Sequence, residues 1–295
     1  MKNQISLFLD SGAFSAFTKG INIDIQAYIS FIKEHKEYID IYANLDVIGD
    51  AEKSLENQKI MEEAGLSPIP CFHLNEDFSY LKYYVENYGY IALGGIAQAG
   101  PAAQPWMDQC FEMFCDNKGY PKCKVHGFAV TSLRLMLRYP WFSVDSTSWV
   151  MTSRMGFIYI PRYKNGQWVY DENSWKACVS SRSPSKSDDG KHIDTFPQNA
   201  KEHIIEYLAM KGYNLGSSEF KMAMAKKYQL EENEKWNGKE NPDGTREVEI
   251  IIEDGLCNNY KLRDEVNIIY FLDLEKTMPE WPWPFKQKGV QRFEM

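Results

Sequence analysis

Polar residues follow apolar runs at several places in this sequence of 295 residues. The run LFLDSGAF puts Asp10 directly before Ser11 and Gly12, and later apolar runs end at Asp46 and Asp145. A carboxylate can act as a nucleophile, and a second one can move protons to and from a leaving group. Small residues after Asp10 would let a substrate approach that carboxylate closely. The pattern therefore indicates a site for nucleophilic and acid–base chemistry.

The same pattern recurs at the ends of other runs. His73, the pair Gly94 and Gly95, and His126 each close an apolar run. Any one of these residues alone is more commonly a turn former, a helix cap or a hydrogen-bonded structural histidine. Their repetition after successive runs favours a shared site instead.

Short apolar runs alternate with amphipathic segments through the first two-thirds of the chain. The predicted strands cover residues 6–10, 39–46, 67–73, 89–95, 123–128, 141–145 and 156–163. The predicted helices cover residues 25–35, 51–64, 78–87, 106–114 and 132–137. Such alternation is typical of an α/β fold with parallel strands. It favours a (β/α)8 TIM-like barrel, in which the carboxyl ends of the strands build the active site.

The pattern changes after the last of these strands. Further helices are expected near residues 197–211 and 219–228, before a charged stretch and the apolar runs VEIIIED and VNIIYFLDLE. We expect residues 1–215 to form the barrel. Residues 216–295 are expected to form a small C-terminal appendage of helices and strands.

Composition excludes several classes of protein. Hydrophobic residues make up 44% of the chain, and no apolar run is long enough to span a bilayer. The N-terminus lacks a signal-peptide pattern, and six cysteines without a CxxC pair fit a reducing cytoplasm. P-loop, GxSxG, HExxH and dinucleotide-binding motifs are absent. We therefore expect a cytoplasmic enzyme that uses no cofactor and no metal.

Charge is distributed unevenly along the sequence. The whole chain carries a net charge of −8, but residues 118–191 hold 12 Lys and Arg against 5 Asp and Glu. A local excess of positive charge is typical of a surface that faces phosphates. Arg154, Arg162 and Lys164 are the residues we expect to bind nucleic acid. Chance clustering on solvated faces would produce the same count, so this alternative stays open.

Four segments resemble motifs of the tRNA-guanine transglycosylases, barrel enzymes that exchange a base without breaking the backbone. These segments are LDSGAF at 9–14, ANLDVIGD at 43–50, IALGGIA at 91–97 and FSVDSTSWVMTSRMG at 142–156. Together they cover roughly residues 5–165 in the order of that family. The CxC…CxxC…H zinc site of the family is absent, and CFHLNED at 71–77 stands in a neighbourhood that the family builds differently. The chain is thus most similar to the zinc-free phage and bacterial branch that places 7-deazaguanine in DNA (the DpdA type).

The resemblance implies roles for particular residues. Asp145 would be the nucleophile that forms a glycosyl-aspartate, and Asp10 would transfer protons. The substrate-binding residues would be Ser11, Gly12, Asp46, His73, Gly94, Gly95 and His126. The implied activity is that of a pentosyltransferase that exchanges guanine in DNA for a free 7-deazaguanine base such as preQ0, in the cytoplasm of the cell or of a phage host.

Three alternatives stay open from sequence. The polymer could be tRNA, although loss of the zinc site disfavours it. His73 and His126 could bind a metal with Asp10 or Asp145, as in metal-dependent TIM-barrel hydrolases, although no HxH follows the first strand. A catalytically inactive barrel that binds a partner is the third alternative.

Overall fold

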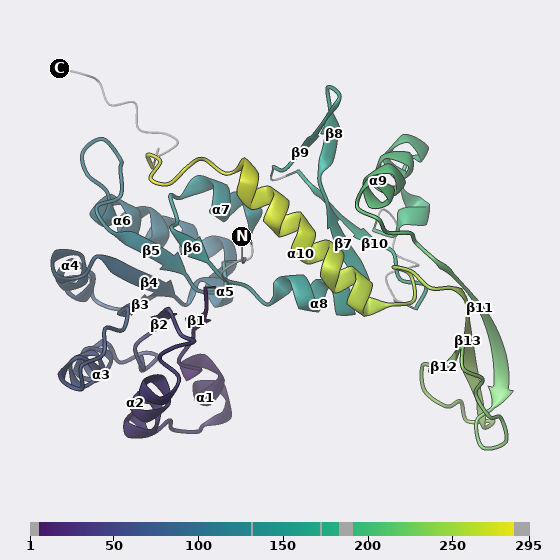
Figure 1. The fold of residues 1–295 in the computed structure, drawn as a ribbon, viewed down its shortest axis with the longest axis horizontal. Helices are drawn as coiled ribbons and strands as arrows, with labels where there is room; N and C mark the ends of the chain where they lie inside the picture. Colours follow the sequence, from purple (N-terminus) through teal and green to yellow (C-terminus); the bar gives the residue numbers. More distant parts are fainter. Residues whose placement is uncertain (1–5, 131, 172, 183–190, 286–295) are drawn as a thin grey trace. The chain divides into compact units, whose positions relative to one another are not determined.

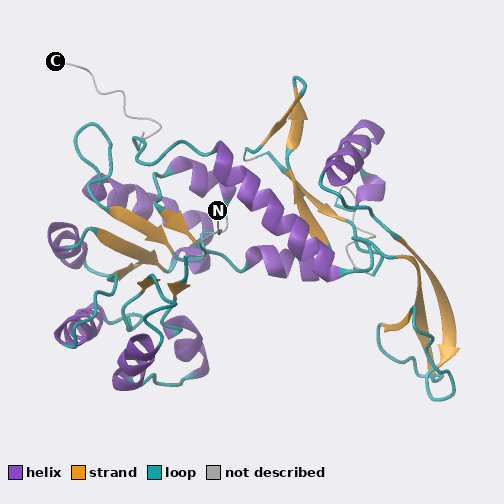
Figure 2. Ribbon diagram, in the orientation of Figure 1, coloured by secondary structure: helices purple, strands orange, loops and turns teal. Residues whose placement is uncertain are grey.

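The computed structural model of the protein describes residues 6–130, 132–171, 173–182 and 191–285. The chain divides into two compact units, one made of Met1–Ser146 with Pro279–Met295 and the other of Thr147–Met278. The division expected between residues 215 and 216 therefore falls inside the second unit. Both units contain helices and strands (Figure 2).

Parallel strands form the centre of the first unit (Figure 1). They are β1 (Phe8–Leu9), β2 (Ile41–Tyr42), β3 (Cys71–His73), β4 (Tyr90–Gly94), β5 (Lys124–Gly127) and β6 (Ser143–Val144). β1 pairs with β2, and β3 to β6 pair with one another in chain order, all in parallel. A parallel bridge between Ala43 and Ile69 links the two groups. The expectation of an α/β fold with parallel strands is confirmed for these six segments.

Helices connect these strands. They are α1 (Ala13–Lys19), α2 (Ile25–Glu34), α3 (Ala51–Glu63), α4 (Phe78–Asn87), α5 (Ile96–Ala99), α6 (Gln104–Phe114) and α7 (Leu133–Arg138). Asp24, Asp50 and Asp77 cap α2, α3 and α4, each accepting a hydrogen bond from a first-turn N–H. Such caps satisfy N–H groups that have no partner inside the helix. The helices predicted between the strands are confirmed within a few residues.

Aromatic side chains fill the interior of the first unit. Phe111 of α6 stacks on Tyr139, with 4.6 Å between ring centroids, and both residues are fully buried. On the other side of the strands, Phe8 of β1 stacks on His126 of β5 with centroids 4.4 Å apart. β1 and β5 are separated by three strands in the pairing order. The sheet therefore curls back towards its first strand.

The second unit has a different, largely antiparallel architecture. Its strands are β7 (Phe157–Ile160), β8 (Arg162–Lys164), β9 (Gln167–Val169), β10 (Trp175–Cys178), β11 (Ser217–Met224), β12 (Glu234–Asn237) and β13 (Thr245–Glu253). Its helices are α8 (Ser148–Arg154), α9 (Gln198–Met210) and α10 (Tyr260–Thr277), with a 3-10 turn at Ile193–Thr195. β7 pairs antiparallel with β10 and does not continue the parallel series. The hairpin β8–β9 turns at Asn165 and Gly166, which both have positive φ.

One predicted helix is wrong. Residues 219–228, expected to be helical, lie largely in β11, which pairs with β13 in the three-stranded sheet β11–β13–β12. Met and Ala favour helices, but Phe220, Met222 and Met224 alternate with other residues at the period of a strand. Pairing with the long strand β13 outweighs the local propensity.

The long helix α10 lies against α8 and β7 within the second unit. Fully buried Asn267 links these elements, because its side chain accepts a hydrogen bond from the Tyr159 N–H and donates one to the Trp149 carbonyl.

Among helices of the described residues, none has the length and apolar character that crossing a membrane requires.

We expect Asn267→Ala to lower the free energy of unfolding by about 1–3 kcal/mol, because it leaves the buried Tyr159 N–H without a partner. Ile268→Ala is the control, since Ile268 is the next residue of α10 and is 40% exposed. Urea unfolding of the full chain measures both losses. Equal losses would show that Asn267 acts only by filling space.

Candidate active site

Asp46 and His73 form the most buried polar contact among the predicted site residues. The Asp46 Oδ2 atom lies 2.7 Å from His73 Nε2, and the Asp46 Oδ1 atom accepts a hydrogen bond of 3.0 Å from Ser11 Oγ. The Asp46 side chain is 8% exposed. Burial alone would lower the pKa of His73, but the hydrogen bond and charge of Asp46 outweigh it, so the pKa is raised. The contact therefore favours protonated His73.

Gly94 makes room for this histidine. A Cβ atom at position 94 would lie 2.4 Å from His73 Cε1 and 3.2 Å from Cys71 Sγ. The first distance is shorter than a Cβ contact allows, and the second is tight, so the imidazole lies against the bare backbone of β4. Gly95 has a φ of 80° and precedes α5, a conformation that favours glycine. Glycine is therefore favoured at positions 94 and 95 for structural reasons, in addition to the expected close approach of a base.

Asp10 lies at the carboxyl end of β1, where Gly12 turns the chain into α1 with a φ of 74°. The Gly12 N–H donates to Asp10 Oδ1 over 3.4 Å. Although solvent reaches Asp10, desolvation by the surrounding protein raises its pKa, and the negative charge of Asp46 adds to this increase. Asp10 therefore keeps its proton to a higher pH than a free aspartate.

Asp145 follows β6. Its Oδ1 atom accepts a hydrogen bond of 2.6 Å from the Ala129 N–H and lies 3.9 Å from His126 Nε2. The side chain is 51% exposed, so a substrate can reach it. Desolvation raises the pKa of Asp145, and the charge of Asp10 raises it further. Asp10 thus influences the ionisation of Asp145 and is itself influenced by Asp46.

His126 contacts the Ser143 hydroxyl, which in turn contacts the Tyr90 hydroxyl. Its Nδ1 atom lies 2.7 Å from Ser143 Oγ, which in turn lies 2.6 Å from the Tyr90 hydroxyl. The Nε2 atom is buried and has no hydrogen-bond partner among the described residues. Burial lowers the pKa of His126 to about 4. His126 is therefore a neutral imidazole at neutral pH.

Three side chains could together hold a metal ion. Ligand atoms of Asp46, Cys71 and His73 all lie within 4.8 Å of one another. Residues 71 and 73 share a face of β3, because alternate residues of a strand point the same way. The sequence analysis paired His73 with His126 and did not consider Cys71. The expectation of no metal stays a prediction.

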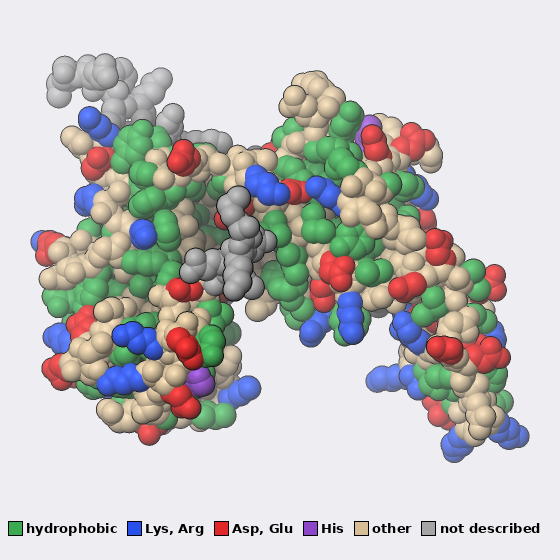
Figure 3. Space-filling model, in the orientation of Figure 1, with side chains coloured by type: hydrophobic (Ala, Val, Ile, Leu, Met, Phe, Trp, Pro, Cys, Tyr) green, Lys and Arg blue, Asp and Glu red, His purple; other side chains and the backbone are tan. Residues whose placement is uncertain are grey.

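The predicted nucleic-acid-binding residues all belong to the second unit. Lys164 pairs with Asp171 at 2.7 Å, and Arg162 lies over the ring of Trp175 at 4.0 Å. Arg154 is exposed, with no ion pair or hydrogen bond to any described residue. On the face drawn in Figure 3, Lys and Arg side chains lie among Asp and Glu side chains. Of the three predicted residues, Lys164 has a carboxylate partner, whereas Arg162 and Arg154 have none among the described residues.

The structure brings together Asp10, Ser11, Asp46 and His73, and places Asp145 beside His126. Sequence analysis missed Ser143 and Tyr90, which support His126, because a hydroxyl in a strand carries no pattern that separates it from a surface residue. Comparisons with protein-family models, with curated proteins and with solved structures find no match to this chain.

We expect Gly94→Ala to lower the free energy of unfolding by about 1–3 kcal/mol, because the added Cβ overlaps His73. It should also lower the pKa of His73, since displacement from Asp46 leaves burial as the main influence. Gly89→Ala is the matched control, because nothing lies within 4 Å of an added Cβ there and φ is not positive. Chemical denaturation and NMR titration of the histidines measure the two effects. An unchanged His73 pKa in Gly94→Ala would contradict this account.

Proposed function

We propose that the first unit catalyses the exchange of guanine in DNA for a free 7-deazaguanine base through a covalent glycosyl-aspartate. The observation that carries the proposal is the gathering of Asp10, Asp46 and Asp145 after β1, β2 and β6. They lie close enough that the charge of Asp46 adds to the raised pKa of Asp10, and the charge of Asp10 adds to the raised pKa of Asp145. Exchange at a glycosidic carbon needs a nucleophile and a proton donor close together. The curled parallel sheet is compatible with a TIM-like barrel, the fold that we propose for this unit.

In the first half of the reaction, a carboxylate oxygen of Asp145 forms a bond to the anomeric carbon as the bond from this carbon to guanine breaks. The guanine nitrogen takes the proton of Asp10. In the second half, the incoming base loses a proton to Asp10 and its nitrogen displaces Asp145 from the sugar. The raised pKa of Asp10 supports its role as the acid, because an ordinary aspartate is ionised at neutral pH.

Neighbouring groups prepare Asp145 for this role. The Ala129 N–H fixes one carboxylate oxygen and His126 lies beside it. If Tyr90 donates to Ser143 and Ser143 donates to His126 Nδ1, the imidazole proton resides on Nε2 and faces the carboxylate. A neutral imidazole can then position Asp145 without neutralising its charge.

Asp46 is suited to recognise the base. Ser11 and His73 each contact one of its oxygens, which fixes the carboxylate plane. A carboxylate oxygen has a further lone pair, and this can accept a hydrogen bond from an N–H of guanine or its 7-deaza analogue. In duplex DNA the target nucleotide must leave the base stack, at a cost of a few kcal/mol.

We expect Asp145→Ala to abolish base exchange, whereas Asp145→Asn should also lose exchange but keep the fold, because an amide oxygen still accepts from Ala129. Incubation with labelled guanine and either DNA or tRNA shows which polymer gains label. Mass spectrometry of the denatured wild type should detect a glycosyl adduct on Asp145. The control Asp254→Asn changes an exposed carboxylate outside this unit and should retain exchange. Full exchange by Asp145→Ala would exclude the mechanism.

A metal-dependent hydrolase is the second candidate, favoured by the proximity of Asp46, Cys71 and His73. Burial raises the pKa of Cys71, so a metal would have to displace the thiol proton. It would also have to replace the direct hydrogen bond between Asp46 and His73. Both costs place this candidate behind base exchange.

Metal removal separates the two candidates. For base exchange, we expect full activity after exhaustive chelation and at most a small effect of Cys71→Ser. For the hydrolase, zinc or manganese should co-purify with the chain, and Cys71→Ser should lower the metal content. Cys110→Ser is the control, because Cys110 is an equally buried free cysteine away from these ligands. Metal bound by wild type and by Cys110→Ser, but not by Cys71→Ser, would favour the hydrolase.

A further inference from the structure

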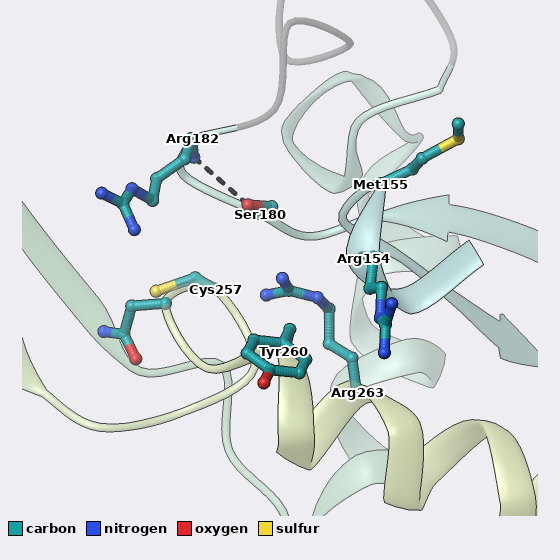
Figure 4. Close-up of a pocket in the computed structure, with 8 residues that line it drawn as sticks. Arg154, Met155, Ser180, Arg182, Cys257, Tyr260 and Arg263 are labelled. Atoms are coloured by element: carbon teal, nitrogen blue, oxygen red, sulfur yellow. Dashed lines mark hydrogen bonds between the residues drawn. The ribbon is translucent and has the colours of Figure 1, made fainter. Parts of the chain in front are cut away.

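The second unit contains a cavity of about 460 Å³. Three arginines, Arg154, Arg182 and Arg263, are among the residues that line it, and none of the lining residues is acidic. Figure 4 shows Arg263 reaching from α10 towards Ser180, with Tyr260 beside it. None of the carboxylates proposed for base exchange lines this cavity.

Arg263 is a buried cation whose direct partners are neutral. Only 5% of the residue is exposed, and its guanidinium donates to the carbonyl oxygens of Ser153 and Leu256. Burial lowers the pKa of Arg263, and the charges of Asp264 and Glu249 only partly oppose this. No ion pair with Arg263 is present among the described residues. A buried charge is costly without a counter-charge. An anion in the cavity would supply that counter-charge.

The other two arginines differ in whether a carboxylate already neutralises their charge. Arg182 pairs with the fully buried carboxylate of Glu249 at 2.8 Å. Exposed Arg154 has no such partner among the described residues. Counting Glu249 and Asp264 against the three arginines leaves an excess of positive charge at the cavity.

The start of α10 adds to this positive potential. The helix runs for 18 residues from Tyr260, and Asn259 caps it by accepting from the Lys261 N–H. N-termini of helices carry partial positive charge and attract phosphate groups. Ser180, buried at the opposite wall, accepts a hydrogen bond from the Arg182 N–H and keeps its own hydroxyl proton for a ligand.

We infer that this cavity binds the phosphate group of a nucleotide, either free or as part of a polynucleotide backbone. Planar guanidinium groups match phosphate oxygens in geometry and charge. The volume exceeds what a phosphate ion needs, and the ring of Tyr260, which is 45% exposed, offers a surface on which a base can stack. The inference does not depend on the chemistry proposed for the first unit.

Calorimetric titration of the full chain tests the ligand class. Inorganic phosphate, guanosine monophosphate, guanosine and a short single-stranded oligodeoxynucleotide are the probes. We expect the monophosphate to bind at least about tenfold more tightly than guanosine, because a charge-assisted hydrogen bond contributes on that scale. Equal affinity for guanosine and its monophosphate, or no binding of any phosphate compound, would overturn the inference.

Variants tie the binding to this cavity. Arg154→Gln should weaken binding of the monophosphate about tenfold. Arg263→Lys should have a similar effect, because lysine keeps the charge but lacks the paired N–H donors of a guanidinium group. The control Lys261→Gln removes one charge from an exposed residue next to Tyr260 that does not line the cavity, and binding should be unchanged. Arg154 is exposed, so Arg154→Gln should fold normally. It therefore still tests the inference if Arg263→Lys fails to fold. Equal losses in Arg154→Gln and Lys261→Gln would overturn the assignment.

Competition identifies the source of the phosphate. If the monophosphate displaces the oligonucleotide and Arg154→Gln weakens both, the cavity holds a backbone phosphate. If the oligonucleotide neither binds nor competes, the ligand is a free nucleotide, and the inference also stands. An oligonucleotide that binds tightly but is not displaced by the monophosphate binds elsewhere on the protein. If the monophosphate itself also fails to bind, the inference is overturned. If the wild-type chain binds the phosphate compounds but shows no base exchange, only the function proposed for the first unit is overturned.

Discussion

Parallel pairing in chain order is the constraint on which the first unit depends. Each helical crossover returns the chain to the same end of the sheet, so residues after successive strands meet at one edge. Asp10, Asp46, His73 and Asp145 come together in this way although they are far apart in sequence. The same constraint surrounds the carboxylates with protein and brings like charges together. Desolvation, with a smaller contribution from the neighbouring charge, therefore raises the pKa values of Asp10 and Asp145.

The parallel centre could be predicted because its signals are local. Aspartates at 24, 50 and 77 begin helices where a cap is needed, and apolar runs mark the strands between them. The state of each site residue could not be predicted, since it depends on neighbours distant in sequence. The sequence shows a histidine at 73 and another at 126. Only the fold shows that Asp46 raises the pKa of one and that burial lowers that of the other.

The second unit marks the limit of sequence reasoning. β7 reads as one more strand of a parallel series, but β10, which follows the hairpin β8–β9, pairs with it in antiparallel orientation. A count of positive residues treats every cation as available, whereas Lys164 is paired with Asp171. Arg263 lies just before the apolar run VNIIYFLDLE, and an arginine is rarely buried. Its burial depends on α8 and the loop before α10, which no local pattern reveals.

The neutral state of His126 has a consequence for the temperature response of the first unit. Imidazole releases its proton with a large heat of ionisation, whereas carboxyl groups ionise almost athermally. His126 is uncharged across the neutral range, so proton binding at Asp10 and Asp145 involves carboxyl groups and not this imidazole. The pKa values of these two groups should therefore change little between cold and warm conditions. His73, whose pKa is raised beside Asp46, is the imidazole in this unit whose ionisation should change with temperature.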